Sequence, residues 1–156
     1  MRYWLFPLMI VSVFSACSRE TAFEQFDRLD SRHERAVTNL KRVTLKENNQ
    51  TTALISIIHL NPVDPELYGS RPTFFIALYD KGEKSLEAYN VTLNGSAPVA
   101  IARLDDNCSL RSLMPLNNPW NTYYQVLFKK HDDENLTLRF ETGPSLKGEV
   151  TFQTDQ

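Results

Sequence analysis

Glycine is scarce in this sequence: there are five among 156 residues, and they do not cluster. A dinucleotide-binding turn or a P-loop needs closely spaced glycines, because only they bring several backbone N–H groups against a phosphate. We therefore expect no nucleotide and no other bound cofactor.

Histidine is also scarce, and the three histidines are scattered. His33, His59 and His131 have no second histidine, cysteine or carboxylate at a metal-ligand spacing such as His-x-x-x-His. Ser109 and Ser145 lack the strand–turn–helix setting that exposes an activated hydroxyl. The sequence therefore predicts no metal site, no catalytic residue and no enzymatic activity.

An excess of either charge is missing as well. The 17 basic and 19 acidic residues give a formal net charge of −2, and the two signs are interleaved along the chain. Nucleic-acid-binding proteins need a basic field to neutralise phosphates, so no nucleic-acid partner is expected. The length and the 42% hydrophobic content are typical of one globular domain.

The one long apolar run lies at the N-terminus. Arg2 is followed by apolar residues from Tyr3 to Phe14 and then by small residues, which is the layout of a secretory signal. The run has about 12 residues, whereas a membrane-spanning helix needs about 20. Residues 1–16 are therefore predicted to be an export signal.

The end of this signal carries the most specific motif in the chain. The tetrapeptide Phe14-Ser15-Ala16-Cys17 resembles the lipobox of bacterial lipoproteins, although that family prefers leucine where Phe14 stands. The resemblance implies cleavage before Cys17 and lipid on its thiol, which would tether the chain to a membrane of the bacterial cell envelope. Ser18 is compatible with sorting to the outer membrane, facing the periplasm. The alternative is an ordinary signal cleaved near Ala16, with a cysteine that happens to follow.

A second cysteine, Cys108, lies among acidic residues between two predicted strands. The carboxylates of Asp105 and Asp106 disfavour a reactive thiolate beside them. We therefore interpret Cys108 as structural. An intermolecular disulfide, or a Cys17–Cys108 bridge if Cys17 carries no lipid, is the alternative.

An amphipathic helix is predicted from Glu20 to about Leu40, within a segment 17–41 that joins the anchor to the domain. Its apolar residues recur at intervals of three and four, and Thr21 with Glu24 fits a capping box. The polar face mixes both charges, which disfavours a membrane-surface role. Packing onto its own domain is the first expectation, and binding a partner helix is the second.

From residue 42 to 156 the period changes to two, and β-branched and aromatic residues predominate. The predicted strands are Arg42–Lys46, Thr52–Leu60, Thr73–Tyr79, Ala88–Leu93, Val99–Leu104, Tyr123–Lys130, Leu136–Thr142 and Glu149–Gln153. The strands Thr52–Leu60 and Thr73–Tyr79 are the most continuously apolar and should be central, and Asn94-Gly95 indicates a tight hairpin.

Eight short strands with no helices between them favour a mainly β fold, an antiparallel β-sandwich preceded by one amphipathic helix. An immunoglobulin-like sandwich is one form that fits, although the cysteine–tryptophan–cysteine hallmark is missing. A small barrel is the alternative.

The loop Ser109–Asn121 is the best candidate for binding. Its apolar residues Leu113, Met114, Leu116 and Trp120 could form an anchoring patch for an envelope protein partner. Alternatively, the loop folds over one end of the sandwich and buries Trp120. The leading hypothesis is thus a non-enzymatic, membrane-tethered binding or interaction module.

Two further functions stay open at this point. The first is a periplasmic hydrolase that uses His131 with distant acids, which requires a concave site joining those groups. The second is a small-ligand or glycan-binding module, which requires several aromatic rings to line one groove. The rings in question are Tyr68, Trp120, Tyr123 and Tyr124.

Overall fold

The computed structural model describes residues 31–69, 71–115 and 118–154, and most of them form strands. The strands are β1 (Leu40–Glu47), β2 (Gln50–His59), β3 (Thr73–Asp80), β4 (Asn90–Leu93), β5 (Ala100–Arg103), β6 (Thr122–Leu127), β7 (Asn135–Thr142) and β8 (Leu146–Gln153). Each corresponds to one of the eight predicted strands. Cys17, the export signal and residues 20–30 of the predicted helix lie outside the described residues.

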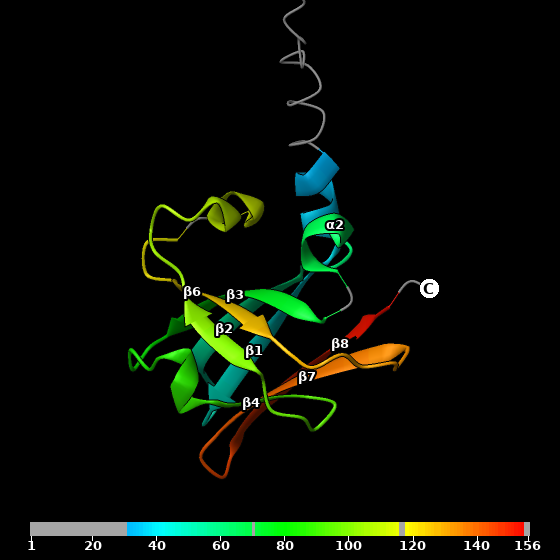
Figure 1. Cartoon of the computed structure of the whole chain (residues 1–156). Coiled ribbons are helices and arrows are strands. Elements are labelled where there is room, and N and C mark those ends of the chain that lie inside the picture. The colour runs from blue at the N-terminus through cyan, green and yellow to red at the C-terminus, as the bar shows by residue number, and fades with distance from the viewer. Residues whose placement is uncertain (1–30, 70, 116–117, 155–156) are drawn as a thin grey trace, which may run out of the picture.

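Two antiparallel sheets form the architecture (Figure 1). The large sheet has the order β1-β2-β3-β6-β5, and the small sheet has the order β4-β7-β8. The prediction of a mainly β, antiparallel sandwich is therefore confirmed, with β2 and β3 inside the large sheet as expected. An immunoglobulin domain places its third strand in the second sheet, whereas β3 here is the middle strand of the first, so the strand order is a different one.

The main core lies between the two sheets and follows from the alternation of the strands. In β7, Leu136, Leu138 and Phe140 are at most 1% exposed, while the residues between them are partly or fully exposed. Across the gap, the large sheet contributes residues such as Ile55 and Phe74, which are fully buried in the same cluster. A two-residue period thus assigns one face of each sheet to the core.

One close approach joins the two sheets along their edges. A Cβ atom on Gly148 of β8 would lie 2.4 Å from Val43 Cγ1 and 2.6 Å from Leu45 Cδ2 of β1. At the same edge, the Lys41 ammonium lies 5.2 Å above the centre of the Phe152 ring. Glycine at 148 therefore lets β8 lie against β1.

Helical segments cover part of the other face of the large sheet (Figure 1). They are residues 31–38, α2 (Pro65–Tyr68) and the 3₁₀ segment η2 (Ser109–Leu113), while η1 (Leu86–Ala88) precedes β4. Ala36 is fully buried in a second cluster with Ile58 and Phe75 of the sheet. Arg32 also pairs with Asp64 at 3.4 Å. The described part of the predicted helix therefore packs on its own domain.

The Asn94-Gly95 turn forms, but the hairpin expected from it does not. Both residues have positive φ, 47° and 82°, and Leu93 and Ser96 exchange backbone hydrogen bonds of 2.9 and 2.8 Å around them. The strands on either side, however, belong to different sheets. The chain uses this tight turn to cross from the small sheet to the large one, because β4 pairs with β7 instead of β5.

No helix among the described residues is long and apolar enough to cross a lipid bilayer.

Candidate binding surface

One part of the outer face of the large sheet is left uncovered by the helical segments. Arg42 of β1 lies directly opposite Ser56 of β2, which in turn lies opposite Ala77 of β3. In the next row, Leu54 lies opposite Tyr79. Leu54 is 38% exposed although it lies in a strand inside the sheet. This apolar side chain faces outward, where alternation of a soluble sheet would place a polar one.

Trp120 stands beside this face and is 76% exposed. Its position is fixed by the turn before it: the Trp120 N–H donates to Asn118 Oδ1 at 3.0 Å, and the Asn121 N–H donates to the Asn118 carbonyl at 3.0 Å. The Tyr123 hydroxyl also donates to that carbonyl, at 3.4 Å. The backbone under the exposed indole is therefore held in place by hydrogen bonds.

Between Trp120 and the sheet lies a groove of about 390 Å³, called here the Trp120 groove. Its walls are largely apolar, and among the described residues its lining includes one cation and no acid. The side chains that shape it include Arg42, Leu54, Ser56, Tyr79, Met114 and Trp120. A concave apolar surface with a few polar groups is the usual form of a binding site.

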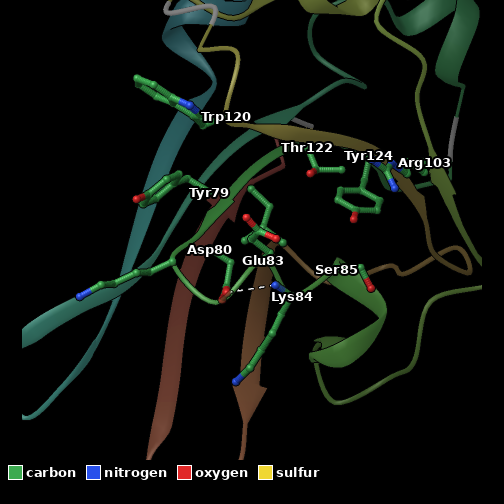
Figure 2. Close-up of a pocket in the computed structure, with 11 residues that line it drawn as sticks. Tyr79, Asp80, Glu83, Lys84, Ser85, Arg103, Trp120, Thr122 and Tyr124 are labelled. Atoms are coloured by element: carbon green, nitrogen blue, oxygen red, sulfur yellow. Dashed lines mark hydrogen bonds between the residues drawn. The ribbon is translucent and has the colours of Figure 1, made fainter.

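A second hollow, of about 640 Å³, lies on the other side of Trp120 and Tyr79 and is lined by charged residues (Figure 2). Its Asp80 carboxylate is engaged locally: Oδ1 accepts the N–H groups of Gly82 at 2.7 Å and Lys84 at 3.1 Å. The Tyr89 hydroxyl donates to Oδ2. Burial, together with the Asp80 carboxylate, raises the pKa of Tyr89 well above its usual range. These hydrogen bonds hold the turn together.

Three of the four apolar residues that the sequence grouped in one patch are described, and they differ in exposure. Leu113 and Met114 are each 6% exposed and belong to the second cluster, although the Met114 side chain reaches the groove wall. Leu116 lies outside the described residues. Trp120 is exposed, so the alternative in which the loop buries it does not hold.

The sequence did not identify Arg42, Leu54 and Tyr79 as part of this surface. All three lie in strands that were correctly predicted, but a strand has two faces. Leu54 faces outward and Ile55 is fully buried, but both are apolar residues in the same apolar run of β2. Their residue types alone therefore do not show which of them faces the core. The register with β1 and β3 decides this, and register is a long-range property.

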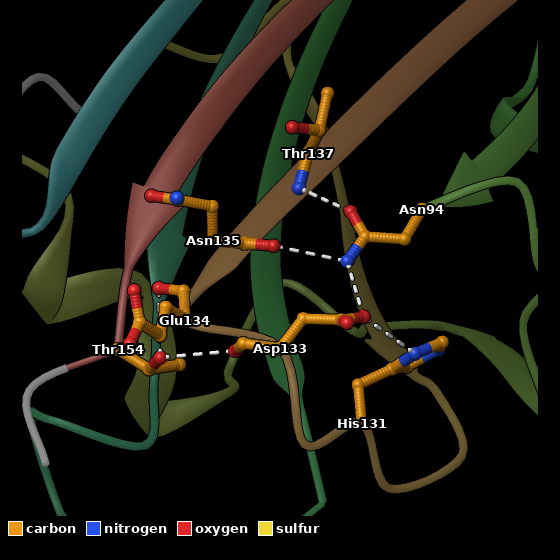
Figure 3. Close-up of polar contacts among 7 residues, drawn as sticks. All are labelled: Asn94, His131, Asp133, Glu134, Asn135, Thr137 and Thr154. Carbon is orange, nitrogen blue, oxygen red and sulfur yellow. Dashed lines mark hydrogen bonds and ion pairs between the residues drawn. The ribbon is translucent and has the colours of Figure 1, made fainter.

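A separate polar cluster surrounds His131 (Figure 3). The Asn94 amide donates to Asp133 Oδ2 at 2.8 Å and to the Asn135 carbonyl at 2.9 Å, and its Oδ1 accepts the Thr137 N–H at 2.7 Å. His131 Nδ1 lies 3.4 Å from the same Asp133 oxygen. Asn94 thus fastens the turn before β5 to the start of β7.

This cluster gives little support to a hydrolase. Thr154 lies on the side of the cluster away from His131, where its hydroxyl donates to the Asp133 and Glu134 carbonyls at 3.1 and 2.8 Å. His131 Nε2 is buried and has no hydrogen-bond partner among the described residues. The imidazole is therefore not aligned with a hydroxyl nucleophile in that part of the chain.

The four aromatic residues that a glycan groove required are dispersed. Tyr123 and Tyr124 are 2% and 1% exposed, and they belong to the two clusters on opposite faces of the large sheet. Tyr68 packs against the second cluster, and burial raises the pKa of its hydroxyl. Trp120 alone of the four presents an exposed ring.

The remaining candidate groups for chemistry are also in structural positions. Cys108 is half-buried next to the second cluster and directly precedes η2. In the part of the chain that the structure describes, no three histidine, cysteine or carboxylate side chains gather as metal ligands.

The fold and this surface together define an eight-stranded, two-sheet β-domain with an apolar groove beside one exposed tryptophan. No protein-family model, curated protein or solved structure matches the chain.

Proposed function

We propose that this chain is a bacterial cell-envelope lipoprotein, tethered to the membrane through lipid on Cys17. Its β-sandwich acts as a non-enzymatic module that binds another component of the envelope. The Trp120 groove is the binding surface. The observation that carries this proposal is the 76% exposure of Trp120 beside an apolar groove.

The composition of the groove supports binding. Trp120, Tyr79 and Arg42 are of the three residue types most enriched among side chains that dominate binding energy. Leu54 adds exposed apolar area between the strands. Because the turn around Asn118 already fixes the Trp120 backbone, little conformational entropy would be lost when the indole is covered.

The absence of a catalytic role is supported by how the acidic groups are used. Asp80 and Asp133, which lie nearest to candidate acid–base partners, accept hydrogen bonds that hold loops in place. A catalytic carboxylate needs an oxygen that is free to exchange a proton with a substrate.

The anchor is tested by labelling the chain in a bacterial host with an alkyne analogue of palmitate. We expect label on the wild type, an N-terminal diacylated peptide beginning at Cys17 in mass spectra, and no label on Cys17→Ser. Label retained by Cys17→Ser, or a mature N-terminus elsewhere, would refute the tether.

The binding surface is tested by photo-crosslinking in living cells. A photoreactive residue at position 121, on the rim of the groove, should give a defined adduct, and one at position 147, on the small sheet, should not. Trp120→Ala should abolish the position-121 adduct, while Leu67→Ala, which removes another exposed apolar side chain, should leave it unchanged. An adduct that is insensitive to Trp120→Ala would move the binding site elsewhere.

A further inference from the structure

The chemistry of the Trp120 groove indicates what kind of group it holds, and this step rests on the function proposed above. Arg42 is exposed and makes no ion pair with any residue in the ranges that the structure describes. It is the one charged side chain among the described residues of the lining. An isolated guanidinium beside an apolar surface favours an anion, because no neighbouring acid competes for it.

A hydroxyl lies next to this cation. Ser56 is the direct cross-strand partner of Arg42, and both side chains line the groove. A carboxylate has two oxygens and can accept hydrogen bonds from both groups at once. Arg42 and Ser56 can therefore bind one carboxylate together.

Apart from Asn118 and Asn121, the rest of the groove lining is apolar or aromatic, which suits an apolar chain. Leu54, Met114 and the rings of Tyr79 and Trp120 form its walls. Its volume of about 390 Å³ lies within the range of small-molecule sites, roughly 300–1,000 Å³. The groove therefore has room for one small amphiphile.

We propose that the Trp120 groove binds a single-chain amphiphilic carboxylate of the fatty-acid class. The acyl chain lies between Leu54 and Trp120, and the carboxylate pairs with Arg42. In a membrane-tethered protein such a ligand is close at hand, because lipid turnover releases it at the same surface.

The test uses residues 17–156 with Cys17→Ser, because all eight strands and both apolar clusters lie within residues 31–154. Trp120 is then the one tryptophan present, since the other is Trp4, so its emission reports on the groove directly. The probes are decanoate, decanol and decyltrimethylammonium, with decanol titrated below its solubility limit and the two ionic probes below their critical micelle concentrations.

We expect decanoate to shift the Trp120 emission to shorter wavelength with at least tenfold higher affinity than decanol or the cationic amphiphile. Arg42→Gln should reduce the affinity for decanoate to that for decanol and leave decanol unchanged. Arg71→Gln, an exposed arginine that does not line the groove, should change neither. Leu54→Ser should weaken all three probes by a similar factor.

The proposal is overturned if decanol binds as well as decanoate, or if Arg42→Gln leaves the affinity for decanoate unchanged. Saturable binding of an acidic, leucine-containing peptide with no response to decanoate would assign the groove to a protein partner and overturn it too. A Trp120-dependent photo-adduct in cells without decanoate binding rejects the ligand class alone. If position 121 of the otherwise wild-type protein gives no photo-adduct in cells, the proposed function itself is rejected.

Discussion

The two outer faces of the sandwich differ in how their side chains pair with one another. On the small sheet, residues directly opposite each other on β7 and β8 pair with one another. Arg139 binds Glu149 at 3.1 Å, Lys147 binds Glu141 at 3.6 Å, and the hydroxyls of Thr137 and Thr151 lie 3.0 Å apart. The charged and hydroxyl side chains of this face are thus paired across the two strands.

The uncovered part of the large sheet is built differently. Leu54 and Trp120 expose apolar area, and Arg42 has no acidic neighbour there among the described residues. A face selected only for solubility would resemble that of the small sheet, with alternating charges directly opposite each other. The contrast supports binding as the reason for the apolar groove, and substitutions on the two sheets test it.

The largest loss of stability is expected at Gly148, where the two sheets meet. Gly148→Ala places a Cβ 2.4 Å from Val43 and 2.6 Å from Leu45, both buried side chains, so β8 has to move away from β1. We expect a loss of about 3 kcal/mol in the free energy of unfolding, measured in urea. Gly82→Ala is the matched control, because its new Cβ meets one flexible carboxylate oxygen at 3.3 Å. Equal costs for the two variants would contradict the close approach of the sheets.

A pH-dependent loss of stability is expected from His59. Its ring lies at the edge of the core against Phe74, with the ring centres 5.0 Å apart. Burial lowers its pKa from 6.5 to about 4, and the Asn61 side chain opposes this shift in part. The unfolded chain therefore takes up a proton at a higher pH than the folded protein does. His59 contributes its full stability above about pH 6.5, and this contribution is lost as the pH falls toward 4.

Between pH 7 and pH 5 we expect His59 to account for a loss of about 2 kcal/mol. His59→Phe keeps a ring in place and cannot titrate, so its stability should fall less over the same interval in urea unfolding. Parallel pH profiles for the two proteins would show that the imidazole is not buried in its neutral form.

A smaller loss is expected at the edge of the small sheet. Asn94→Ala removes three hydrogen bonds and puts a Cβ-bearing residue without a polar side chain at φ 47°. Because the side chain is exposed and water replaces part of these bonds, we expect a cost of about 1.5 kcal/mol. Asn94→Gly should be more stable than Asn94→Ala by the part of this cost that comes from the positive φ alone. Asn90→Ala, at the exposed start of β4, is the control for general effects on that strand, and a cost equal to that of Asn94→Ala would refute the clamp.

Local pattern explains why the strands could be predicted. Alternation in β7 and the apolar runs of β2 and β3 depend on residues adjacent in sequence, and each predicted strand is present. The turn at Asn94-Gly95 was predicted for the same reason, since positive φ is a property of those residue types. What these local signals could not supply is the strand with which β4 pairs.

The groove could be predicted only in part. The apolar, proline-containing loop indicates Trp120 as part of an anchoring patch, and the structure leaves it exposed. Arg42, Leu54 and Tyr79 join it through the register of β1, β2 and β3, which brings together residues far apart in the chain. The close approach at Gly148 could not be predicted for a similar reason, because a glycine in a strand does not reveal which neighbour lies against it.

The smallest effect, and the most direct test of the comparison, is expected at Leu54. If its outward side chain serves binding, Leu54→Thr should change the free energy of unfolding by less than about 0.5 kcal/mol, because Leu54 is 38% exposed and little packing is lost. Ile55→Thr, one position along the same strand but fully buried, should cost several times more in the same urea titration. Similar costs at both positions would mean that the uncovered face is packed in solution. The apolar groove would then belong to the fold, and the reason to regard it as a binding surface would be removed.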